Sequence, residues 1–328
     1  MRFCSRSKAI ELMNGWGRDR VPFFFVISFD LETCYVERMD RIDVQELRFD
    51  FGGTRNYEVK HTPVPTRFRW QVSPMAYEAY KRGFDRVMQH IFRGDSFLTN
   101  YTSSTPIDTD LSLLQMFEYA KAPYKIWMKD RFVLFSPERF VQIEGRRISS
   151  CPMKGTLDAT LPEAEKRLRS DLKEQAEHAT IVDLIRNDLS RVADAVRVAR
   201  YAYIDRLETN RGPILQMSSE ITGQLPADFN RELGTLFFRL LPAGSITGAP
   251  KRKTVEIIHR AELSPRNFYT GVAGMWDGES LDSAVLIRFI EQSDRGKMVY
   301  RSGGGITHRS DPEKEYEEMI QKVYVPIY

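Results

Sequence analysis

Short apolar runs alternating with charged residues dominate the first 60 positions of the chain. The longest run, VPFFFVI at Val21–Ile27, indicates a buried β-strand, and CYVERM and ELRFDFGG are typical of further strands and turns. The following segment, His61–Pro74, contains three prolines. Because proline continues neither a helix nor a central strand, we predict a connection there.

Helical periodicity begins at Met75. Apolar and aromatic residues then recur at steps of three and four as far as Ile91, and Gly94 ends the pattern. A longer helical pattern runs from about Pro162 to Val192, and no further proline interrupts it, so we predict one long helix there. Shorter helical stretches are predicted at 229–241 and 251–261.

The other apolar runs have the character of strands and follow one another along the chain with helices interspersed. They include SFLTNYTSSTPI, YKIWMK, RFVLFSP, RFVQIEG, RRISSCP, RVARYAYIDRLE, PILQMSSEITGQL, FYTGVAGMWDG, DSAVLIRFIEQ and KMVYRSGGGITH. A final helix is predicted in SDPEKEYEEMIQKV, with Pro312 in its first turn and a capping box of Ser310 and Glu313. This succession favours an α+β fold over a doubly wound sheet.

Composition and charge narrow the classes of function. The 328 residues carry a net charge of only +3 and contain no basic block with interleaved aromatic residues, so we expect no nucleic-acid partner. The run at 21–27 is too short to cross a bilayer and has no cleavage site of a signal peptide, so we expect no membrane association. Three widely spaced cysteines suit a reducing compartment, and we expect a cytoplasmic protein.

Two predicted helices each carry glutamates three residues apart, Glu174 with Glu177 and Glu315 with Glu318. This spacing puts each pair on one helix face, and Lys322 extends the second face. Solvated surface glutamates are the simplest interpretation. Carboxylates that gather in one place would instead suit Mg²⁺, which prefers oxygen ligands and leaves positions for substrate oxygens.

Two segments are rich in glycine: LPAGSITGAPK at Leu241–Lys251 and RSGGGITH at Arg301–His308. Glycines before a helix let backbone amides approach an anion. Neither segment matches the Walker A or dinucleotide pattern, which disfavours nucleotide binding and leaves a carboxylate ligand or simple tight turns. A third segment, CPMKGT, places Lys154 before a Gly-Thr pair, where it is either a surface amine or a nucleophile.

Taken together, these segments resemble the chorismate-utilising enzymes, a family that includes the component I subunits of anthranilate synthase and aminodeoxychorismate synthase, isochorismate synthase and salicylate synthase. The resemblance covers roughly residues 75–328, after a short strand-rich segment at 1–74 that we expect to pack on the same fold. It rests on the ordered segments GDSFLTNYT, SPERF, CPMKGT, EQAEHATIVDLIRNDLSRV, LPAGSITGAPKRKTVEIIHRAE, FYTGVAGMWDG, DSAVLIRF and SGGGITHRSDPEKEYEEMIQK. It implies two large antiparallel sheets with flanking helices, an active site in the cleft between them, and Mg²⁺ as cofactor.

Lys154 separates the subfamilies, because the family's anthranilate synthases have alanine there and its aminodeoxychorismate synthases have lysine. The resemblance therefore implies that Lys154 attacks C2 of chorismate as the C4 hydroxyl leaves. Ammonia then attacks C4 and displaces the lysine, giving 4-amino-4-deoxychorismate for folate synthesis. An amine is nucleophilic only when neutral, so we expect burial or a cationic neighbour to lower the pKa of Lys154.

The resemblance implies roles for further residues, position by position. Glu138 would protonate the departing hydroxyl, which requires a raised carboxyl pKa. Glu177 and Glu318 would bind Mg²⁺ directly, with Glu174 and Glu315 beside them through water. The residues implied to contact the two substrate carboxylates or to line the cleft are Gly155, Thr156, Tyr269, Arg288, Gly303, Gly304, Gly305 and Lys322.

Two positions depart from the family pattern. Leu98 stands where water-adding members have a lysine base and ammonia-using members usually have glutamine, which disfavours isochorismate and salicylate formation. Gln216 stands where a histidine is usual, so any proton handling by that histidine must be absent or reassigned.

The chain has no cysteine in a glycine-rich nucleophile turn, so we expect ammonia to come from a separate glutamine amidotransferase subunit or from ammonium salts. Two alternatives remain open. One is anthranilate synthase component I, which aminates C2 rather than C4. The other is a non-catalytic homologue, which the joint presence of Glu138, Lys154, Glu177, Arg288 and Glu318 disfavours.

Overall fold

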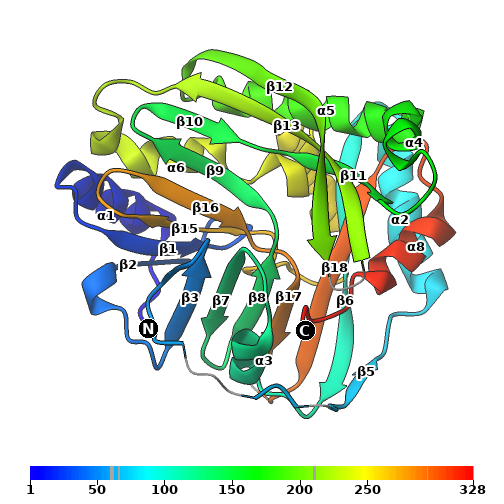
Figure 1. The fold of residues 1–328 in the computed structure, drawn as a ribbon, viewed down its shortest axis with the longest axis horizontal. Helices are drawn as coiled ribbons and strands as arrows, with labels where there is room; N and C mark the ends of the chain where they lie inside the picture. The colour runs from blue at the N-terminus through cyan, green and yellow to red at the C-terminus, as the bar shows by residue number, and fades with distance from the viewer. Residues whose placement is uncertain (60–62, 66, 210–211, 294, 328) are drawn as a thin grey trace.

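The structure is a computed structural model that describes residues 1–59, 63–65, 67–209, 212–293 and 295–327. Its strands form two 9-stranded antiparallel sheets, shown one above the other in Figure 1. Helices flank both sheets, which confirms the predicted α+β class. None of the helices in the described ranges is long and apolar enough to cross a membrane.

The first sheet has the order β11 (Met153–Asp158), β13 (Gly212–Gln224), β10 (Arg147–Ser150), β9 (Arg139–Glu144), β16 (Leu281–Val285), β15 (Val272–Trp276), β1 (Phe23–Ile27) and β2 (Cys34–Arg38), with β12 (Asp194–Thr209) paired to β13. The second sheet has the order β14 (Gly248–Ala249), β6 (Leu98–Thr109), β18 (Met298–Ile306), β17 (Phe289–Gln292), β8 (Phe132–Ser136), β7 (Tyr124–Met128), β3 (Leu47–Phe51) and β4 (Thr54–Arg55), with β5 (Trp70–Val72) paired to β6.

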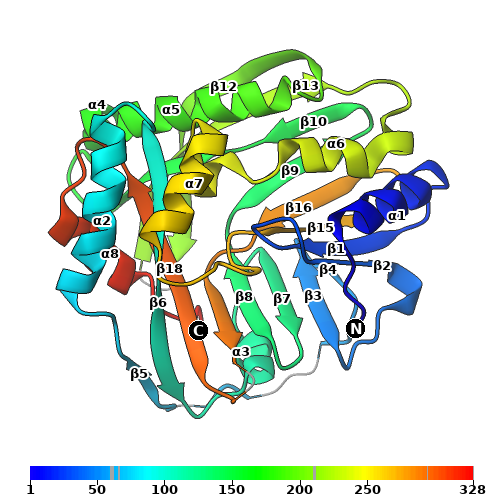
Figure 2. The ribbon, with the colours of Figure 1, turned by 180° about the vertical axis from the view of Figure 1, so that it is seen from behind.

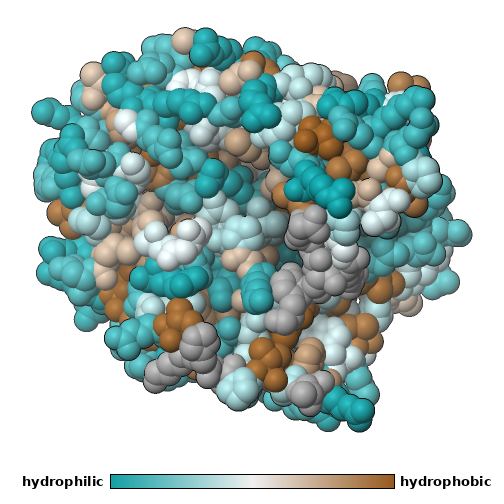
Figure 3. All heavy atoms as spheres, viewed as in Figure 1, coloured by the Kyte–Doolittle hydropathy of each residue, from teal (hydrophilic) through white to brown (hydrophobic). Residues whose placement is uncertain are grey.

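The helices lie around these sheets, and Figure 2 shows several of them on the reverse face. They are α1 (Arg6–Arg18), α2 (Tyr77–Phe92), α3 (Leu113–Tyr119), α4 (Ala164–Ser170), α5 (Leu172–Leu189), α6 (Leu233–Leu240), α7 (Lys251–Ala261) and α8 (Pro312–Gln321), with 3₁₀ turns η1 (Met39–Arg41), η2 (Phe229–Glu232) and η3 (Gly244–Ile246). The face shown in Figure 3 is mostly hydrophilic, with hydrophobic residues in small scattered groups.

Two of the places where the chain passes from one sheet to the other lie next to each other. Pro137 and Glu138 join β8 of the second sheet to β9 of the first, and residues 286–288 join β16 of the first sheet to β17 of the second. The two passages are hydrogen-bonded at both ends: the Val285 amide donates to the Glu138 carbonyl and the Phe135 amide to the Arg288 carbonyl, each at 3.1 Å. Glu138 and Arg288 therefore both lie where the sheets meet.

Strand β1 shows why the apolar run at 21–27 is a strand. All five residues Phe23–Ile27 are buried, and the strand is paired on both sides, with β2 and with β15. A strand covered on both faces needs continuous apolar residues rather than alternation, and FFFVI supplies them. The predicted buried strand is confirmed.

Helix α1 and helix α3 were not predicted. The buried residues of α1 are Ala9, Met13 and Gly17, a stripe too weakly apolar to stand out among the surrounding strand-like runs. In the predicted connection at 61–74, β5 pairs with β6, while residues 60–62 and 66 lie outside the described residues.

Two helix boundaries also differ from prediction. The expected single helix at 162–192 is broken at Asp171, whose ψ of 104° is extended and whose carboxylate accepts a hydrogen bond from the Glu174 amide. Asp171 thus starts a new helix, because a side chain that bonds to backbone amides competes with helix continuation. At α8 the N-cap is Asp311, which accepts from the Glu313 and Lys314 amides, so the predicted capping box of Ser310 and Glu313 is wrong.

The packing of α2 against the second sheet can be tested at Gly83. A Cβ there would overlap the Tyr101 hydroxyl and lie 2.9 Å from the Ala261 carbonyl oxygen. Gly83→Ala should therefore lower the free energy of unfolding by about 1–3 kcal/mol through overpacking. The control is Gly15→Ala in α1, where a Cβ meets nothing within 4 Å and helix propensity should raise stability. Urea denaturation measures both, and equal stabilisation by the two substitutions would contradict this packing.

Candidate active site

The site begins at the edge of the first sheet, on β11. Its pairing with β13 shifts register between Met153 and Thr156, so the strand is irregular at Lys154 and Gly155. Gly155 has φ +80°, a conformation that favours glycine. A Cβ there would also lie 3.3 Å from a Glu174 carboxylate oxygen. The glycine therefore lets β11 approach α5 closely.

Helices α5 and α8 bring the predicted glutamate pairs to this edge. The Lys154 amine donates to a Glu177 carboxylate oxygen at 2.8 Å, and only 7% of the Glu177 side chain is exposed. From α8, Glu318 pairs with Lys322 at 2.7 Å, and the Lys322 amine also donates to the Gly303 carbonyl at 2.8 Å. The simple interpretation of solvated surface glutamates is therefore incomplete for Glu177 and Glu318, because Lys154 neutralises the first carboxylate and Lys322 the second.

A cavity of about 400 Å³ lies at this place. It is bounded by β11, α5, α8, strand β18 and the two passages between the sheets. All fourteen residues predicted for the site line it, namely Glu138, Lys154, Gly155, Thr156, Glu174, Glu177, Tyr269, Arg288, Gly303, Gly304, Gly305, Glu315, Glu318 and Lys322. Residues distant in sequence thus converge on one cleft.

The charges around Lys154 act in opposite directions. Burial lowers the pKa of Lys154, but the carboxylates of Glu177, Glu174 and Glu318 raise it by more, so it stands above its ordinary value. The expectation that the surroundings lower this pKa is therefore wrong for the protein without ligands. The reason is that three carboxylates approach the amine. For Lys322, burial prevails over the attraction of Glu318 and lowers the pKa.

Glu138 has the environment of a proton donor. Burial raises the pKa of its carboxyl group, against the opposing effects of Ser245, Lys154 and Arg288. The Ser245 hydroxyl, in η3, donates a hydrogen bond to the Glu138 carboxylate. Glu138 is thus held in the passage by its backbone and aimed by a serine from another segment.

Tyr269 and Arg288 line the same cavity beside the second passage. Burial raises the pKa of Tyr269 to about 12, so its hydroxyl stays protonated at neutral pH. Arg288 has φ +52°, which is unfavourable for a residue with a side chain. Such strain persists only where the surroundings impose it, and it is frequent at functional sites.

The two departures from the family pattern also lie at the cavity. The Gln216 amide donates to the Gly155 carbonyl at 2.9 Å, and its oxygen accepts from the Thr156 hydroxyl at 3.1 Å. Gln216 therefore fixes the β11 backbone. The Leu98 side chain faces Gly305: a Cβ on Gly305 would lie 3.0 Å from a Leu98 methyl carbon. Leu98 therefore makes the cavity wall apolar at this point.

Sequence reasoning missed other lining residues, among them Asn100, Ser245, Ile246 and Thr270. The amide oxygen of Asn100 is buried and has no hydrogen-bond partner. Ser245 and Ile246 lie inside the glycine-rich segment GSITGAPK, which was a usable signal. Asn100 and Thr270 lie in GDSFLTNYT and FYTGVAGMWDG, which carry the family resemblance, but their residue types alone do not distinguish them from other polar residues.

The carboxylates can be compared with the needs of Mg²⁺. Their oxygen donors suit this ion, and the missing side chain of Gly304 leaves space between them: a Cβ there would lie 3.3 Å from a Glu315 oxygen and 3.9 Å from a Glu318 oxygen. As they stand, the described residues include no group of three or more Asp, Glu, His or Cys side chains that could hold a metal ion. The carboxylates are of the chemical type that Mg²⁺ prefers, but Lys154 is paired with Glu177 and Lys322 with Glu318.

The raised pKa of Glu138 predicts a stabilising substitution. An unfolded glutamate ionises near pH 4.3, whereas the buried one keeps its proton to higher pH, so between these values the native state loses stability as pH rises. Glu138→Gln removes this loss and should raise the free energy of unfolding at pH 8 by about 1 kcal/mol, with the gain shrinking toward pH 4. Urea denaturation at both pH values measures it, with exposed Glu144→Gln as control. A less stable Glu138→Gln variant at pH 8 would refute the assigned burial cost.

Comparison with known proteins extends these findings. The model of the chorismate binding enzyme family matches residues 28–327, farther toward the N-terminus than the predicted 75–328. An uncharacterised PabA-like protein of Pasteurella multocida is 50% identical over 322 residues, covering 97% of this chain and 98% of that protein. Two further relatives are each 32% identical. Aminodeoxychorismate synthase component 1 of Escherichia coli is matched over 77% of this chain and 58% of its own length. Anthranilate synthase component 1 of Archaeoglobus fulgidus is matched over 91% and 69%.

The fold is shared with solved structures of low sequence identity. The menaquinone-specific isochorismate synthase MenF of Escherichia coli superposes with a TM-score of 0.74 at 19% identity, covering 98% of this chain and 82% of that one. The matched family model includes both passages and all the cavity-lining residues, and of the strands only β1 lies outside its range. On this evidence the chain belongs to the chorismate binding enzyme family.

Proposed function

We propose that this protein converts chorismate and ammonia to 4-amino-4-deoxychorismate, the reaction of aminodeoxychorismate synthase component I, in the synthesis of 4-aminobenzoate and folate. The observation that carries the proposal is the place of Lys154: its amine lies inside the cavity, 2.8 Å from Glu177, in the same cleft as Glu138. A lysine serving only solubility would extend into bulk water.

The cavity suits a substrate with two carboxylates. Arg288 and Lys322 supply positive charge, and the guanidinium fork of Arg288 can bind a carboxylate through two hydrogen bonds. Thr156 and Gly155 line the same cavity. We assign the enolpyruvyl carboxylate to Arg288 and Tyr269, and the ring carboxylate to Gly155 and Thr156.

The proposed reaction has two substitutions. Neutral Lys154 forms a bond from its nitrogen to C2 while the ring double bonds shift and the C4–oxygen bond breaks; Glu138 gives its proton to the departing hydroxyl, which leaves as water. Ammonia then forms a bond to C4, the double bonds shift back, and the C2–nitrogen bond breaks to release the lysine amine. A covalent intermediate divides one difficult step into two easier ones.

The reaction requires a neutral Lys154 amine. The protein alone does not supply one, because the neighbouring carboxylates raise the pKa of Lys154 and keep the amine protonated. We assign Mg²⁺ to Glu177 and Glu318, with Glu174 and Glu315 beside them. Bound Mg²⁺ would supply positive charge that stabilises the ring carboxylate and offsets the carboxylates that hold the proton on Lys154.

Specific residues disfavour the other chorismate reactions. Sequence identity to the two relatives of named activity is equal, so it does not separate C4 from C2 amination. Lys154 does, since the anthranilate synthase pattern has alanine there. Leu98 gives no base to activate water, which argues against isochorismate formation. We further propose that a glutamine amidotransferase subunit supplies the ammonia.

Product identification tests the reaction. Wild-type protein incubated with chorismate, MgCl₂ and ammonium sulfate should form 4-amino-4-deoxychorismate, detected by liquid chromatography and mass spectrometry. Lys154→Ala should lower the rate by roughly three orders of magnitude, because the nucleophile is gone. The control is Lys166→Ala, because the Lys166 side chain is 76% exposed and does not line the cavity. Formation of the C4 product by Lys154→Ala at the wild-type rate would refute the mechanism.

Metal binding has a separate test. Glu318→Gln should weaken Mg²⁺ binding by at least about 10-fold, measured by isothermal titration calorimetry, since a neutral amide is a poor ligand for a hard cation. Glu317→Gln, in the same helix but outside the cavity, should leave the affinity unchanged. Equal affinities in all three proteins, or full activity in excess chelator, would remove Mg²⁺ from the proposal.

A further inference from the structure

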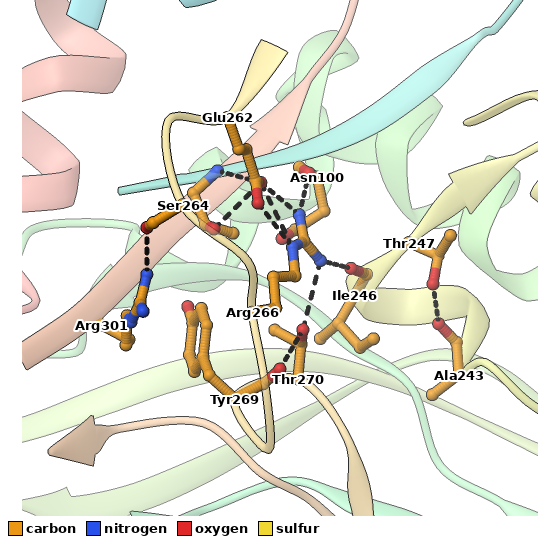
Figure 4. Close-up of polar contacts among 11 residues, drawn as sticks. Asn100, Ala243, Ile246, Thr247, Glu262, Ser264, Arg266, Tyr269, Thr270 and Arg301 are labelled. Atoms are coloured by element: carbon orange, nitrogen blue, oxygen red, sulfur yellow. Dashed lines mark hydrogen bonds and ion pairs between the residues drawn. The ribbon is translucent and has the colours of Figure 1, made fainter. Parts of the chain in front are cut away.

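A buried ion pair lies directly behind the wall of the cavity. Glu262 and Arg266 follow α7, and only 4% and 2% of their side-chain surfaces are exposed. Glu262 also accepts hydrogen bonds from the amide and the hydroxyl of Thr102 in β6, each at 2.9 Å. Figure 4 shows the pair among the segments that it connects. Neither residue belongs to the lining of the cavity.

The Arg266 guanidinium uses its donors in three directions. Two nitrogens bond to the Glu262 carboxylate at 2.9 and 2.6 Å. One terminal nitrogen donates to the Ile246 carbonyl at 2.9 Å and to the Thr270 hydroxyl at 3.2 Å, and the other donates to the Asn100 carbonyl at 2.7 Å. A planar guanidinium has five N–H groups in a fixed geometry, and all five are engaged here.

The partners of Arg266 are parts of the cavity wall. Asn100, Ile246 and Thr270 all line the cavity, although they come from three separate segments. Ile246 directly follows Ser245, the donor to Glu138. A shift of the Ile246 carbonyl would therefore move the serine away from the carboxyl group.

Thr270 directly follows Tyr269 and needs support of its own. Its φ of +59° is unfavourable for a β-branched residue. Its hydroxyl donates to the Tyr269 carbonyl at 2.6 Å and accepts from Arg266 at 3.2 Å. Arg266 therefore helps to hold a strained turn that sets the position of the Tyr269 side chain.

We propose that Arg266 is a positioning residue for chorismate turnover: through Asn100, Ile246 and Thr270 it fixes the places of Ser245, Glu138 and Tyr269 relative to one another. The inference rests on the proposed function, because it requires that these side chains act on chorismate. Small displacements of catalytic groups lower rates strongly, by roughly 100-fold for about 1 Å.

The first variant is Arg266→Lys. It keeps a positive charge beside Glu262, but a single ammonium cannot reach Asn100, Ile246 and Thr270 together. The expected result is a fall in kcat of roughly 100-fold with KM for chorismate changed by less than about 3-fold. A wild-type kcat would overturn the proposal.

The pH profile separates positioning from a merely structural role. When Ser245 is no longer held against Glu138, the ionised carboxylate loses a hydrogen bond, so its pKa should rise and the alkaline limb of kcat/KM should move to higher pH. Lys154 and Arg288, the other charged groups facing Glu138, are unchanged. An unmoved limb together with a lowered kcat would count against the proposal.

A double substitution removes the pair without leaving a lone buried charge. Glu262→Gln with Arg266→Gln should restore thermal stability relative to Arg266→Gln alone, because no unpaired carboxylate stays buried. If Arg266 serves only stability, kcat recovers together with the melting temperature. The proposal expects kcat to stay low in the double variant, and recovery to the wild-type value would overturn it.

Arg301→Lys is the matched control. Arg301 is also buried, pairs with Glu291 and bonds to Ser264 and Pro265 in the same loop, but these partners lie outside the cavity lining. This variant should lose stability while keeping kcat within about 3-fold. Equal losses of kcat in Arg301→Lys and Arg266→Lys would show a general disturbance of the loop and overturn the proposal.

If the Arg266 variants do not fold, Thr270→Val removes the guanidinium contact together with the hydrogen bond to the Tyr269 carbonyl at nearly constant volume, and an unchanged kcat in that variant overturns the proposal. Every ratio is taken for the product that the wild-type protein forms from chorismate. If that product is not 4-amino-4-deoxychorismate, the proposed function fails, while the comparison of variants still decides the role of Arg266.

Discussion

The two hydrogen-bonded passages between the sheets are the constraint on which the site depends. A strand that leaves one sheet for another gives up its ladder partners, and its backbone groups must find others. Here the Val285 amide, at the end of β16, donates to the Glu138 carbonyl in the first passage. The Phe135 amide, in β8, donates to the Arg288 carbonyl in the second passage. The positions of an acid and a guanidinium are thereby set by backbone pairing rather than by flexible loops.

Charge balance is the second constraint. The cavity gathers the carboxylates of Glu138, Glu174, Glu177, Glu315 and Glu318 with the cations of Lys154, Arg288 and Lys322. Buried charges of one sign are unfavourable unless they are compensated. Two lysines compensate two glutamates directly, and burial raises the pKa of Glu138, which favours its uncharged form. The charged groups that make the site reactive therefore lower the stability of the folded protein, as is common at functional sites.

Much of this was predictable from the sequence because it depends on local pattern. The FFFVI strand follows from a continuous apolar run, and the placement of Glu174 and Glu177 on one helix face follows from the helical period of three to four residues. The family resemblance then identified the lining residues. What could not be predicted depends on contacts distant in sequence or on competing local bonds. Asp171 breaks a helix because its side chain caps the next one, and the raised pKa of Lys154 arises only once α5 and α8 face β11.

The pairing of β1 between β2 and β15 has a consequence for any shortened form of the protein. Residues 1–74 contribute β1 and β2 to the first sheet and β3, β4 and β5 to the second. A chain starting at residue 75 would leave the backbone groups of β15 and β7 without neighbours on one side. Such open edges are templates for strand addition, so copies of the truncated chain would join edge to edge and aggregate.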